Sequence, residues 1–387
     1  MTEATPPLRV LMSACVPRRR EGGVAAVVYN IGEELTARGH SVIYLFQEDL
    51  CAGSPVRFRE LIFAHRLSQY ISENRHNFSV VNLHAPAGFL YGLRRKWLRQ
   101  KDLPPYVMTL HGLEERRVHA LSREVKKGRA WDFALQNRLW HRFYTFPRFR
   151  WSISTADGAH ACCRDTWNIL QLKYGLEADT TAYIPHGVAS RFFISRTYDS
   201  QRPLKLLYAG TWLDQRGIFY LREALLRLVS KLPGITMTFA GCGCPPEQIR
   251  EFFGLELSSA IDIVPAVPSQ EMQNLFSTHD TFLFPSLLEG LPCVLLEAMA
   301  SGMPVITTET CGMPDIIEDG FNGVLIPPAD APAIERAVLR LAGSHELRQT
   351  MGQAAQQSMK RYTWERSASL LESLFFRVIE ENSQART

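Results

Sequence analysis

The stretch FPSLLEGLPCVLLEAMASGMP, residues 284–304, reads as the end of a buried strand, a polar loop and a helix. The apolar run Thr281–Phe284 has the length of a strand, and Glu289 lies in the loop after it. Pro292 stands where a helix would begin, which suits its fixed φ and missing N–H. The first N–H groups of a helix have no partner within it. This order therefore predicts an anion site at the carboxyl edge of a parallel sheet.

The same stretch carries two glutamates, Glu289 before the helix and Glu297 inside it. Glu297 is surrounded in sequence by apolar residues, where a carboxylate without a partner would be costly to bury. A pair of ligand hydroxyls would satisfy it. A purely structural interpretation is that Glu289 caps the helix and Glu297 forms an internal salt bridge, and residue chemistry alone leaves both interpretations open.

A second loop follows the strand expected at Leu204–Ala209. It runs GTWLDQRG from Gly210 to Gly217, and Arg216 is its one positively charged residue. A guanidinium close to the start of a helix is a candidate phosphate ligand. The alternative is that Arg216 is a solvated surface residue.

Strands and helices alternate on both sides of these loops. The chain opens with strand Leu8–Ala14, the pair Gly22-Gly23, helix Val24–Arg38 and strand Ser41–Phe46. Near-continuous apolar strands between helices predict parallel sheets covered on both faces. The polar stretch 190–203 indicates a domain boundary. Further strands are expected at Val80–His84, Tyr106–His111, Thr181–Pro185, Thr236–Ala240, Asp262–Val264 and Val305–Thr307.

Length and composition fit this architecture. The 387 residues are 46% hydrophobic and 21% charged, enough for two domains with a core each. A net charge of +4 is too mild to predict a nucleic-acid partner. No apolar run is long enough to span a bilayer, and no signal peptide is visible. Cys242-Gly-Cys244 lacks a second pair or a histidine at zinc spacing, so we expect eight reduced cysteines, no metal site and a cytoplasmic protein.

Several motifs together resemble the GT-B glycosyltransferases of family 4, the retaining, nucleotide-sugar-dependent group. The E-x7-E segment from Glu289 to Glu297 and the AMASGMPV sequence that overlaps its end are the most specific of them. The resemblance spans residues 8 to about 375 and also includes His111-Gly112, the IPHGV turn at 184–188, Cys311-Gly-Met-Pro314 and Tyr362-Thr-Trp-Glu365.

This resemblance implies an α/β, GT-B fold of two doubly wound Rossmann-like domains that face each other across a cleft. Residues 1–195 would bind the acceptor, residues 196–364 would bind the nucleotide-sugar donor, and a helix at 365–387 would cross back to the first domain. The implied reaction moves a sugar, with retention, from a nucleoside diphosphate sugar to a hydroxyl of a glycan, polysaccharide or lipid-linked acceptor. No cofactor or metal is expected, and no D-x-D motif is present.

The resemblance also assigns roles. Glu289 and His111 would act on the transferred sugar, Glu297 would bind the ribose hydroxyls, and Arg216 would bind the diphosphate. The remaining donor-binding positions are Gly210, the backbone amides of Val294 and Leu295, the backbone near Val264 for the base, and Gly22 and Gly23 where the chain approaches a substrate.

Two departures from the family pattern and several rival functions remain. Thr211 replaces a frequent arginine, which leaves the diphosphate more dependent on Arg216, and His186 replaces the asparagine of the IPNGV turn. The alternatives are a sugar-nucleotide epimerase and a non-catalytic sugar-nucleotide binder. A nicotinamide oxidoreductase is disfavoured because the glycine motif at Gly241 and Gly243 has Pro246 where the third glycine would stand.

Residues 116–150 are both basic and aromatic. They contain ten Lys and Arg residues against two acidic ones, interleaved with Trp, Phe and Tyr. Such a segment is typical of a contact with an anionic membrane or a lipid-linked acceptor, which would place the protein at the inner face of the membrane. The alternative is that the aromatic residues belong to the core and the charges to a solvated helix face.

Overall fold

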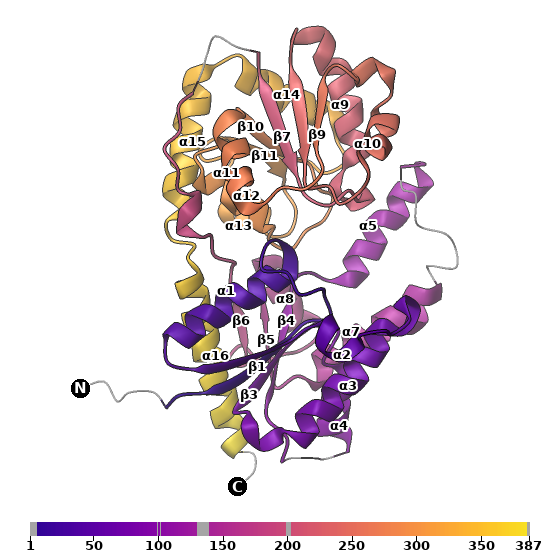
Figure 1. Cartoon of the computed structure of the whole chain (residues 1–387), viewed down its shortest axis with the longest axis vertical. Coiled ribbons are helices and arrows are strands. Elements are labelled where there is room, and N and C mark those ends of the chain that lie inside the picture. The colour runs from indigo at the N-terminus through magenta and orange to yellow at the C-terminus, as the bar shows by residue number, and fades with distance from the viewer. Residues whose placement is uncertain (1–5, 99, 101, 130–138, 199–202, 385–387) are drawn as a thin grey trace, which may run out of the picture. The chain divides into compact units, whose positions relative to one another are not determined.

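The computed structural model describes residues 6–98, 100, 102–129, 139–198 and 203–384. The chain forms two compact units, each built on a six-stranded parallel sheet (Figure 1). The first unit comprises residues 1–115, 134–187 and 364–387, and the second comprises 116–133 and 188–363. The predicted α/β architecture with two parallel sheets is confirmed.

The first unit has the strand order β2-β1-β3-β4-β5-β6. Its strands are β1 (Arg9–Ser13), β2 (Ser41–Leu45), β3 (Val80–His84), β4 (Tyr106–Leu110), β5 (Gly158–Ala161) and β6 (Thr181–Tyr183). Its helices are α1 (Gly23–Ala37), α2 (Gln47–Cys51), η1 (Val56–Phe58), α3 (Arg59–Glu73), η2 (Arg75–Asn77), α4 (Phe89–Trp97), η3 (His141–Thr145), α7 (Phe146–Thr155), α8 (Arg164–Leu172) and α16 (Trp364–Gln384).

The second unit has the strand order β12-β11-β10-β7-β8-β9. Its strands are β7 (Lys205–Ala209), β8 (Thr236–Ala240), β9 (Ile261–Val264), β10 (Thr281–Phe284), β11 (Val305–Thr308) and β12 (Val324–Ile326). Its helices are η4 (Ser190–Phe192), η5 (Asp214–Arg216), α9 (Ile218–Lys231), α10 (Pro246–Phe253), η6 (Leu255–Leu257), α11 (Ser269–Thr278), α12 (Cys293–Ala300), α13 (Met313–Ile316), α14 (Ala331–Ala342) and α15 (His345–Met359). Helix α5 (Glu114–Lys126) contains the division between the units, which falls after Glu115.

The strands form where apolar residues run continuously. Every residue of β3, β4 and β10 is buried, as expected for the interior of a parallel sheet covered on both faces. The sequence analysis missed β5 and β12. Strand β5 reads Gly-Ala-His-Ala and has no β-branched or aromatic residue. It is a strand because β4 and β6 pair with it on either side.

The division of the chain differs from the expected one in two respects. The first unit ends at Gly187, before the expected boundary at residue 195, because Val188 donates a backbone hydrogen bond to Tyr362 of the second unit. Residues 116–133 belong to the second unit, where the buried Glu124 accepts a hydrogen bond of 2.6 Å from the Tyr220 hydroxyl. The segment had been expected in the first domain.

Helix α16, drawn in yellow in Figure 1, lies beside α1 in the first unit. Two residues near the end of α1 and the start of β2 hold its Glu372. The Nδ1 atom of His40 accepts the N–H of Leu8, so its proton is on Nε2, which donates to Glu372 at 2.6 Å. Arg38 donates to the other carboxylate oxygen. Burial opposes ionisation, yet these hydrogen bonds lower the pKa of Glu372.

All eight cysteines are free thiols. Among the described helices, none is both long enough and apolar enough to cross a bilayer.

Candidate functional site

The predicted donor residues gather at one edge of the second sheet. Strands β7, β8, β9 and β10 are parallel neighbours, so their carboxyl ends share that edge. Gly210 directly follows β7, Val264 ends β9, and Glu289 lies in the loop after β10. The sheet therefore brings together loops that are far apart in sequence.

Gly217 sets the distance between the β7 and β10 loops. Its φ of +73° is left-handed, and a Cβ there would stand 2.0 Å from the carbonyl oxygen of Pro285. Only glycine fits this close approach. Arg216 is thereby carried on η5 to the start of the β10 loop, where the backbone N–H of Leu287 donates to the Gln215 carbonyl at 2.7 Å.

Arg216 and Glu289, predicted separately, form an ion pair with each other. Their side chains are only 17% and 11% exposed. The guanidinium also lies over the ring of Phe284, 5.0 Å from its centroid, and the Ser286 hydroxyl donates to Glu289 at 2.9 Å. Arg216 is therefore not the solvated surface residue of the alternative interpretation.

Burial affects both members of this pair: it changes the pKa of Glu289, and it leaves one N–H donor of Arg216 without a partner among the described residues. Burial raises the pKa of Glu289, although the charge of Arg216 and the hydrogen bond from Ser286 oppose that shift. The Nε atom of Arg216 is buried and has no hydrogen-bond partner within the described part of the chain. A guanidinium with an unused donor beside a helix start is suited to an incoming phosphate oxygen.

Helix α12 begins at Cys293, and Pro292 precedes it as its N-cap. The expectation that the Leu295 amide is open to an anion is wrong. Leu295 is fully buried, and its N–H donates to the Pro292 carbonyl at 3.1 Å, a tightened first turn. Val294 is half-buried at the second position of the helix.

Glu297 is half-buried on α12, one turn after Cys293. Burial raises the pKa of the Cys293 thiol, and the Glu297 carboxylate adds to the shift because it lies nearby. The carboxylate is thus placed on the first turns of the helix.

Two further predicted positions lie on the same sheet edge. Gly210 has a φ of +140° and its N–H donates to the Ala240 carbonyl at the end of β8. The Val264 carbonyl accepts the Gly241 N–H at 2.9 Å and keeps a second lone pair for another donor. Thr211, where the family has a cation, is exposed.

In the first unit, Gly22 and Gly23 lie between β1 and α1, and Gly22 is the N-cap of that helix. Both have positive φ, +74° and +67°, and nothing lies within 4 Å of a Cβ built on either. Glycine is required here by backbone conformation rather than by crowding. The open space around both residues leaves their backbone accessible.

His111 follows β4 and joins a group of histidines at the carboxyl edge of the first sheet. Its Nε2 atom lies 2.7 Å from Nδ1 of His84, the last residue of β3. The rings of His111 and His186 are 5.6 Å apart. Burial lowers the pKa of His84 to about 3, and burial with the neighbouring histidines lowers the pKa of His111 well below its ordinary value. Both rings are therefore neutral near pH 7.

The sequence left His84 open between a cleft-lining and a purely structural role, and His160, which lies within the unforeseen strand β5, was missed. Burial lowers the pKa of His160 to about 3, and its Nε2 atom lies 2.7 Å from the Thr109 hydroxyl. The available signal was that strands Val80–His84 and Tyr106–His111 each end in a histidine.

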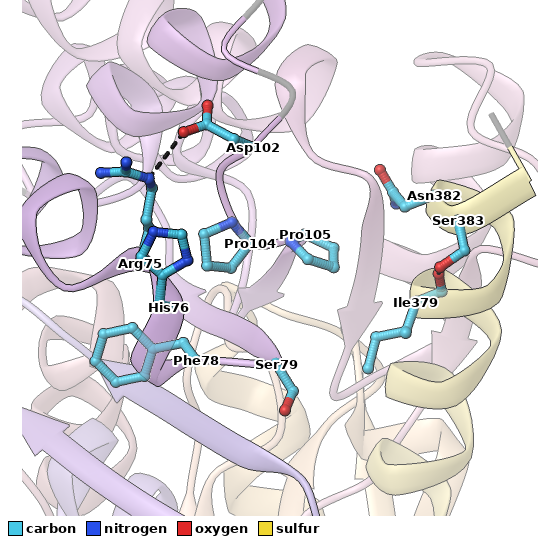
Figure 2. A pocket seen from close by; sticks show the side chains of 10 residues that line it. All are labelled: Arg75, His76, Phe78, Ser79, Asp102, Pro104, Pro105, Ile379, Asn382 and Ser383. Atoms are coloured by element: carbon cyan, nitrogen blue, oxygen red, sulfur yellow. Dashed lines mark hydrogen bonds and ion pairs between the residues drawn. The ribbon is translucent and has the colours of Figure 1, made fainter. Parts of the chain in front are cut away.

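A cavity of about 250 Å³ lies elsewhere in the first unit (Figure 2). Its lining includes Ser79 and Pro105, which precede β3 and β4, and Ile379 of α16. It therefore lies at the amino ends of the strands, away from His84 and His111. Arg75 and Asp102 form an ion pair of 2.8 Å at its rim. None of the predicted site residues lines it.

The basic, aromatic segment 116–150 is divided between the two units. In the second unit, Lys127 pairs with Glu124 at 3.0 Å, and Arg129 pairs with Glu223 at 2.9 Å and lies over the Tyr220 ring. These two cations are thus engaged in ion pairs within the second unit. Residues 130–138, which include Trp131 and Arg138, lie outside the described residues.

Comparison with known families matches both halves of the chain. Residues 21–191 match the model of Glycosyltransferase Family 4, and residues 192–358 match that of Glycosyl transferases group 1. The chain belongs to the group 1 and family 4 glycosyltransferases. The junction between the two matched domains lies four residues from the end of the first structural unit at Gly187.

Similar proteins support this membership of the glycosyltransferase family. An amylovoran biosynthesis glycosyltransferase of Erwinia amylovora is 28% identical over 184 residues, 46% of this chain and 45% of that protein. The match thus spans less than half of that relative's length. Sucrose-phosphate synthase from Thermosynechococcus elongatus superposes with a TM-score of 0.79 at 18% identity, over 97% of this chain and 100% of that one. An Anabaena protein in complex with UDP-glucose gives 0.66 at 15% identity, over 97% and 100%. The structural likeness shows the GT-B fold.

Proposed function

We propose that this protein is a retaining glycosyltransferase that moves a sugar from a nucleoside diphosphate sugar to an acceptor hydroxyl. The observation that carries the proposal is the buried pair of Arg216 and Glu289 beside the start of α12. A cation and a helix N-terminus at one sheet edge suit a diphosphate, and Glu297 on that helix suits ribose hydroxyls. The second unit thus carries the chemistry of a nucleotide-sugar site.

In the proposed reaction the bond between the anomeric carbon and the diphosphate breaks, and negative charge builds on the leaving oxygen. Arg216 and the Val294 amide would stabilise that charge, since donors held in place cost no reorganisation when the bond breaks. Glu289 holds Arg216 in position through their ion pair. We propose that the same carboxylate also faces the sugar, whose anomeric carbon becomes positive as the leaving group departs.

In the first unit we propose that His111 contacts the transferred sugar and that the exposed backbone of Gly22 and Gly23 contacts a substrate. His111 is neutral, so it can donate one hydrogen bond to a sugar hydroxyl without placing a second positive charge near the anomeric carbon. The proposed acceptor is a hydroxyl of a glycan or a lipid-linked glycan. No cofactor is assigned to the transfer.

The test of this function is a panel of UDP, GDP, ADP and TDP sugars, read first by thermal shift. UDP-glucose is the first candidate because the Anabaena protein of the same fold was crystallised with it. A donor at 100 times its dissociation constant stabilises the fold by about 2.7 kcal/mol. The donor that binds is then incubated alone. Slow hydrolysis supports a transferase, a new sugar nucleotide supports an epimerase, and an unchanged donor supports a non-catalytic binder.

Replacing Glu297 by alanine is expected to weaken donor binding about 10- to 100-fold, because hydrogen bonds to a charged group contribute roughly 1.5–3 kcal/mol. Isothermal titration with the nucleoside diphosphate measures the loss. Glu271→Ala, which removes an exposed carboxylate from α11 of the same unit, is the matched control and should leave affinity unchanged. If both variants bind the donor as tightly as the wild type, Glu297 does not bind the donor.

We further propose that residues 139–143, which precede α7, contact an anionic membrane surface. Leu139, Trp140 and Phe143 are 54%, 38% and 73% exposed, and Arg142 beside them is exposed as well. Exposed apolar residues beside a cation are typical of interfacial binding. Because Lys127 and Arg129 are already in ion pairs, we expect the aromatic side chains to contribute more than these charges to membrane binding.

The double variant Trp140→Ser, Phe143→Ser is expected to lose most of its flotation with anionic phosphatidylglycerol vesicles. The buried apolar area of the two rings is the driving force, at about 25 cal/mol per Å². Leu172→Ser, which removes an 88% exposed leucine from α8, is the control. If the double variant and the control float equally well, the membrane contact lies elsewhere on the protein. If the wild-type protein does not float at all, the proposed membrane contact is wrong.

A further inference from the structure

The carboxyl edge of the first sheet carries a cluster of nitrogen and sulfur ligands. His84 ends β3, His111 directly follows β4, Cys162 directly follows β5, and His186 lies three residues after β6. These four strands are neighbours in the order β3-β4-β5-β6, and all are parallel. Each of these residues therefore lies at the same edge.

Three members of this cluster converge on one point. One ligand atom each from His111, Cys162 and His186 lies within 4.8 Å of the other two. A tetrahedral zinc site, with bonds of about 2.1 Å to nitrogen and 2.3 Å to sulfur, places its ligand atoms roughly 3.5 Å apart. Small side-chain rotations close that difference. Cys162 and His186 are 3% and 6% exposed, and His111 is half-buried, which leaves access from solvent.

His84 completes the arrangement as an orienting partner. Its Nδ1 atom lies 2.7 Å from Nε2 of His111, so one nitrogen of the His111 ring is held by a hydrogen bond and the ring is oriented. Metal-binding histidines characteristically have their second nitrogen held in this way. The Nε2 atom of His84 is buried and has no hydrogen-bond partner among the residues described. This edge of the sheet therefore has a buried polar atom that the described residues leave without a hydrogen bond.

We propose that His111, Cys162 and His186 bind a zinc ion, with His84 as the residue that positions His111. Two imidazoles and one thiolate are a donor set that zinc prefers over calcium or magnesium, which take oxygen ligands. Three protein ligands leave a fourth position for water or another small molecule. Sequence reasoning missed the site because its ligands are far apart in the chain and follow three different strands.

The test is a titration of the full-length reduced protein with Co²⁺, followed by competition with Zn²⁺. Bound Co²⁺ should give the visible bands of tetrahedral coordination and a thiolate-to-cobalt charge-transfer band at one equivalent. Zinc should displace it. Cys162→Ala should lose the charge-transfer band and bind zinc at least tenfold more weakly in competition with a chromophoric chelator.

Cys163→Ala is the matched control. Cys163 is the neighbouring buried cysteine, its sulfur lies 3.2 Å from the Thr166 hydroxyl, and it is not among the converging ligands. It should keep the band and the wild-type affinity. A second variant is His186→Asn, which restores the asparagine that the family has in this turn. It should also weaken zinc binding tenfold. Circular dichroism confirms that each variant is folded.

Two results would overturn the site. One is a wild-type protein without a charge-transfer band. The other is a band that survives in Cys162→Ala and disappears in Cys163→Ala or in a variant of Cys242 and Cys244, since the cobalt would then be bound elsewhere.

The consequence for transfer rests on the proposed function. Zinc on His111 would occupy the ring assigned to the sugar, so Zn²⁺ should inhibit transfer with half-inhibition near the dissociation constant from the titration. The cobalt titration does not depend on transfer. A full band with undiminished transfer would therefore overturn the role of His111 and leave the metal site intact, whereas a missing band would overturn the metal site alone.

Discussion

Replacing Arg216 by alanine is expected to lower kcat by about 10²–10³, the usual loss when one charge-stabilising donor is removed from an active site. The loop around it contains no second cation, because Thr211 stands where the family has an arginine. The change also leaves Glu289 buried without its ion-pair partner, which raises the pKa of that carboxyl further. Steady-state transfer with the identified donor measures the effect.

Arg222→Ala is the matched control for this prediction. Arg222 is a more exposed arginine on α9 of the same unit, paired with Glu256 only at 3.8 Å. Its removal should change kcat less than threefold. If Arg216→Ala also loses less than threefold, another residue stabilises the diphosphate.

Arg216→Lys separates charge from geometry. The guanidinium meets Glu289 and the Phe284 ring at once and keeps Nε for a ligand, whereas an ammonium is a compact charge on a flexible stem. We expect the lysine variant to recover only a minor part of the lost turnover. Recovery close to the wild-type rate would show that a point charge is sufficient.

Replacing Glu289 by glutamine is expected to lower kcat by about 10²–10³ while the dissociation constant of the donor changes less than threefold. The amide keeps the shape of the carboxylate and removes its charge, so Arg216 loses its ion-pair partner and the positive charge on the sugar loses its counterion. A loss confined to kcat identifies an interaction made mainly in the transition state. Pre-steady-state turnover and calorimetry give the two quantities separately.

The pH profile gives an independent measurement of the same residue. Because burial raises the pKa of Glu289, its ionised form is lost at a higher pH than for an ordinary glutamate as acid is added. The wild-type rate should therefore fall on the acid side through that raised pKa, and Glu289→Gln should lack this limb. Glu309→Gln, which neutralises an exposed carboxylate directly after β11, should retain the limb and the rate. An unchanged acid limb in Glu289→Gln would assign it to another group.

The alternation of strands and helices and the place of most elements could be predicted from the amino-acid sequence. Strands β3, β8 and β10 have the bounds that were predicted, because continuous apolar runs between helices leave little choice of conformation. The order of strand, loop and helix also placed Glu289, Arg216 and His111 at carboxyl ends of strands. These are local properties, readable from spacing and residue type.

Which of these residues meet depends on how distant segments of the chain pack together. The pairing of Arg216 with Glu289 depends on β7 and β10 being neighbours and on the contact of Gly217 with Pro285. Strand β5 exists because β4 and β6 pair with it, and it brings Cys162 to His111. Strand order and register arise from packing between distant segments, so the local hydrophobic periodicity of the sequence does not predict them.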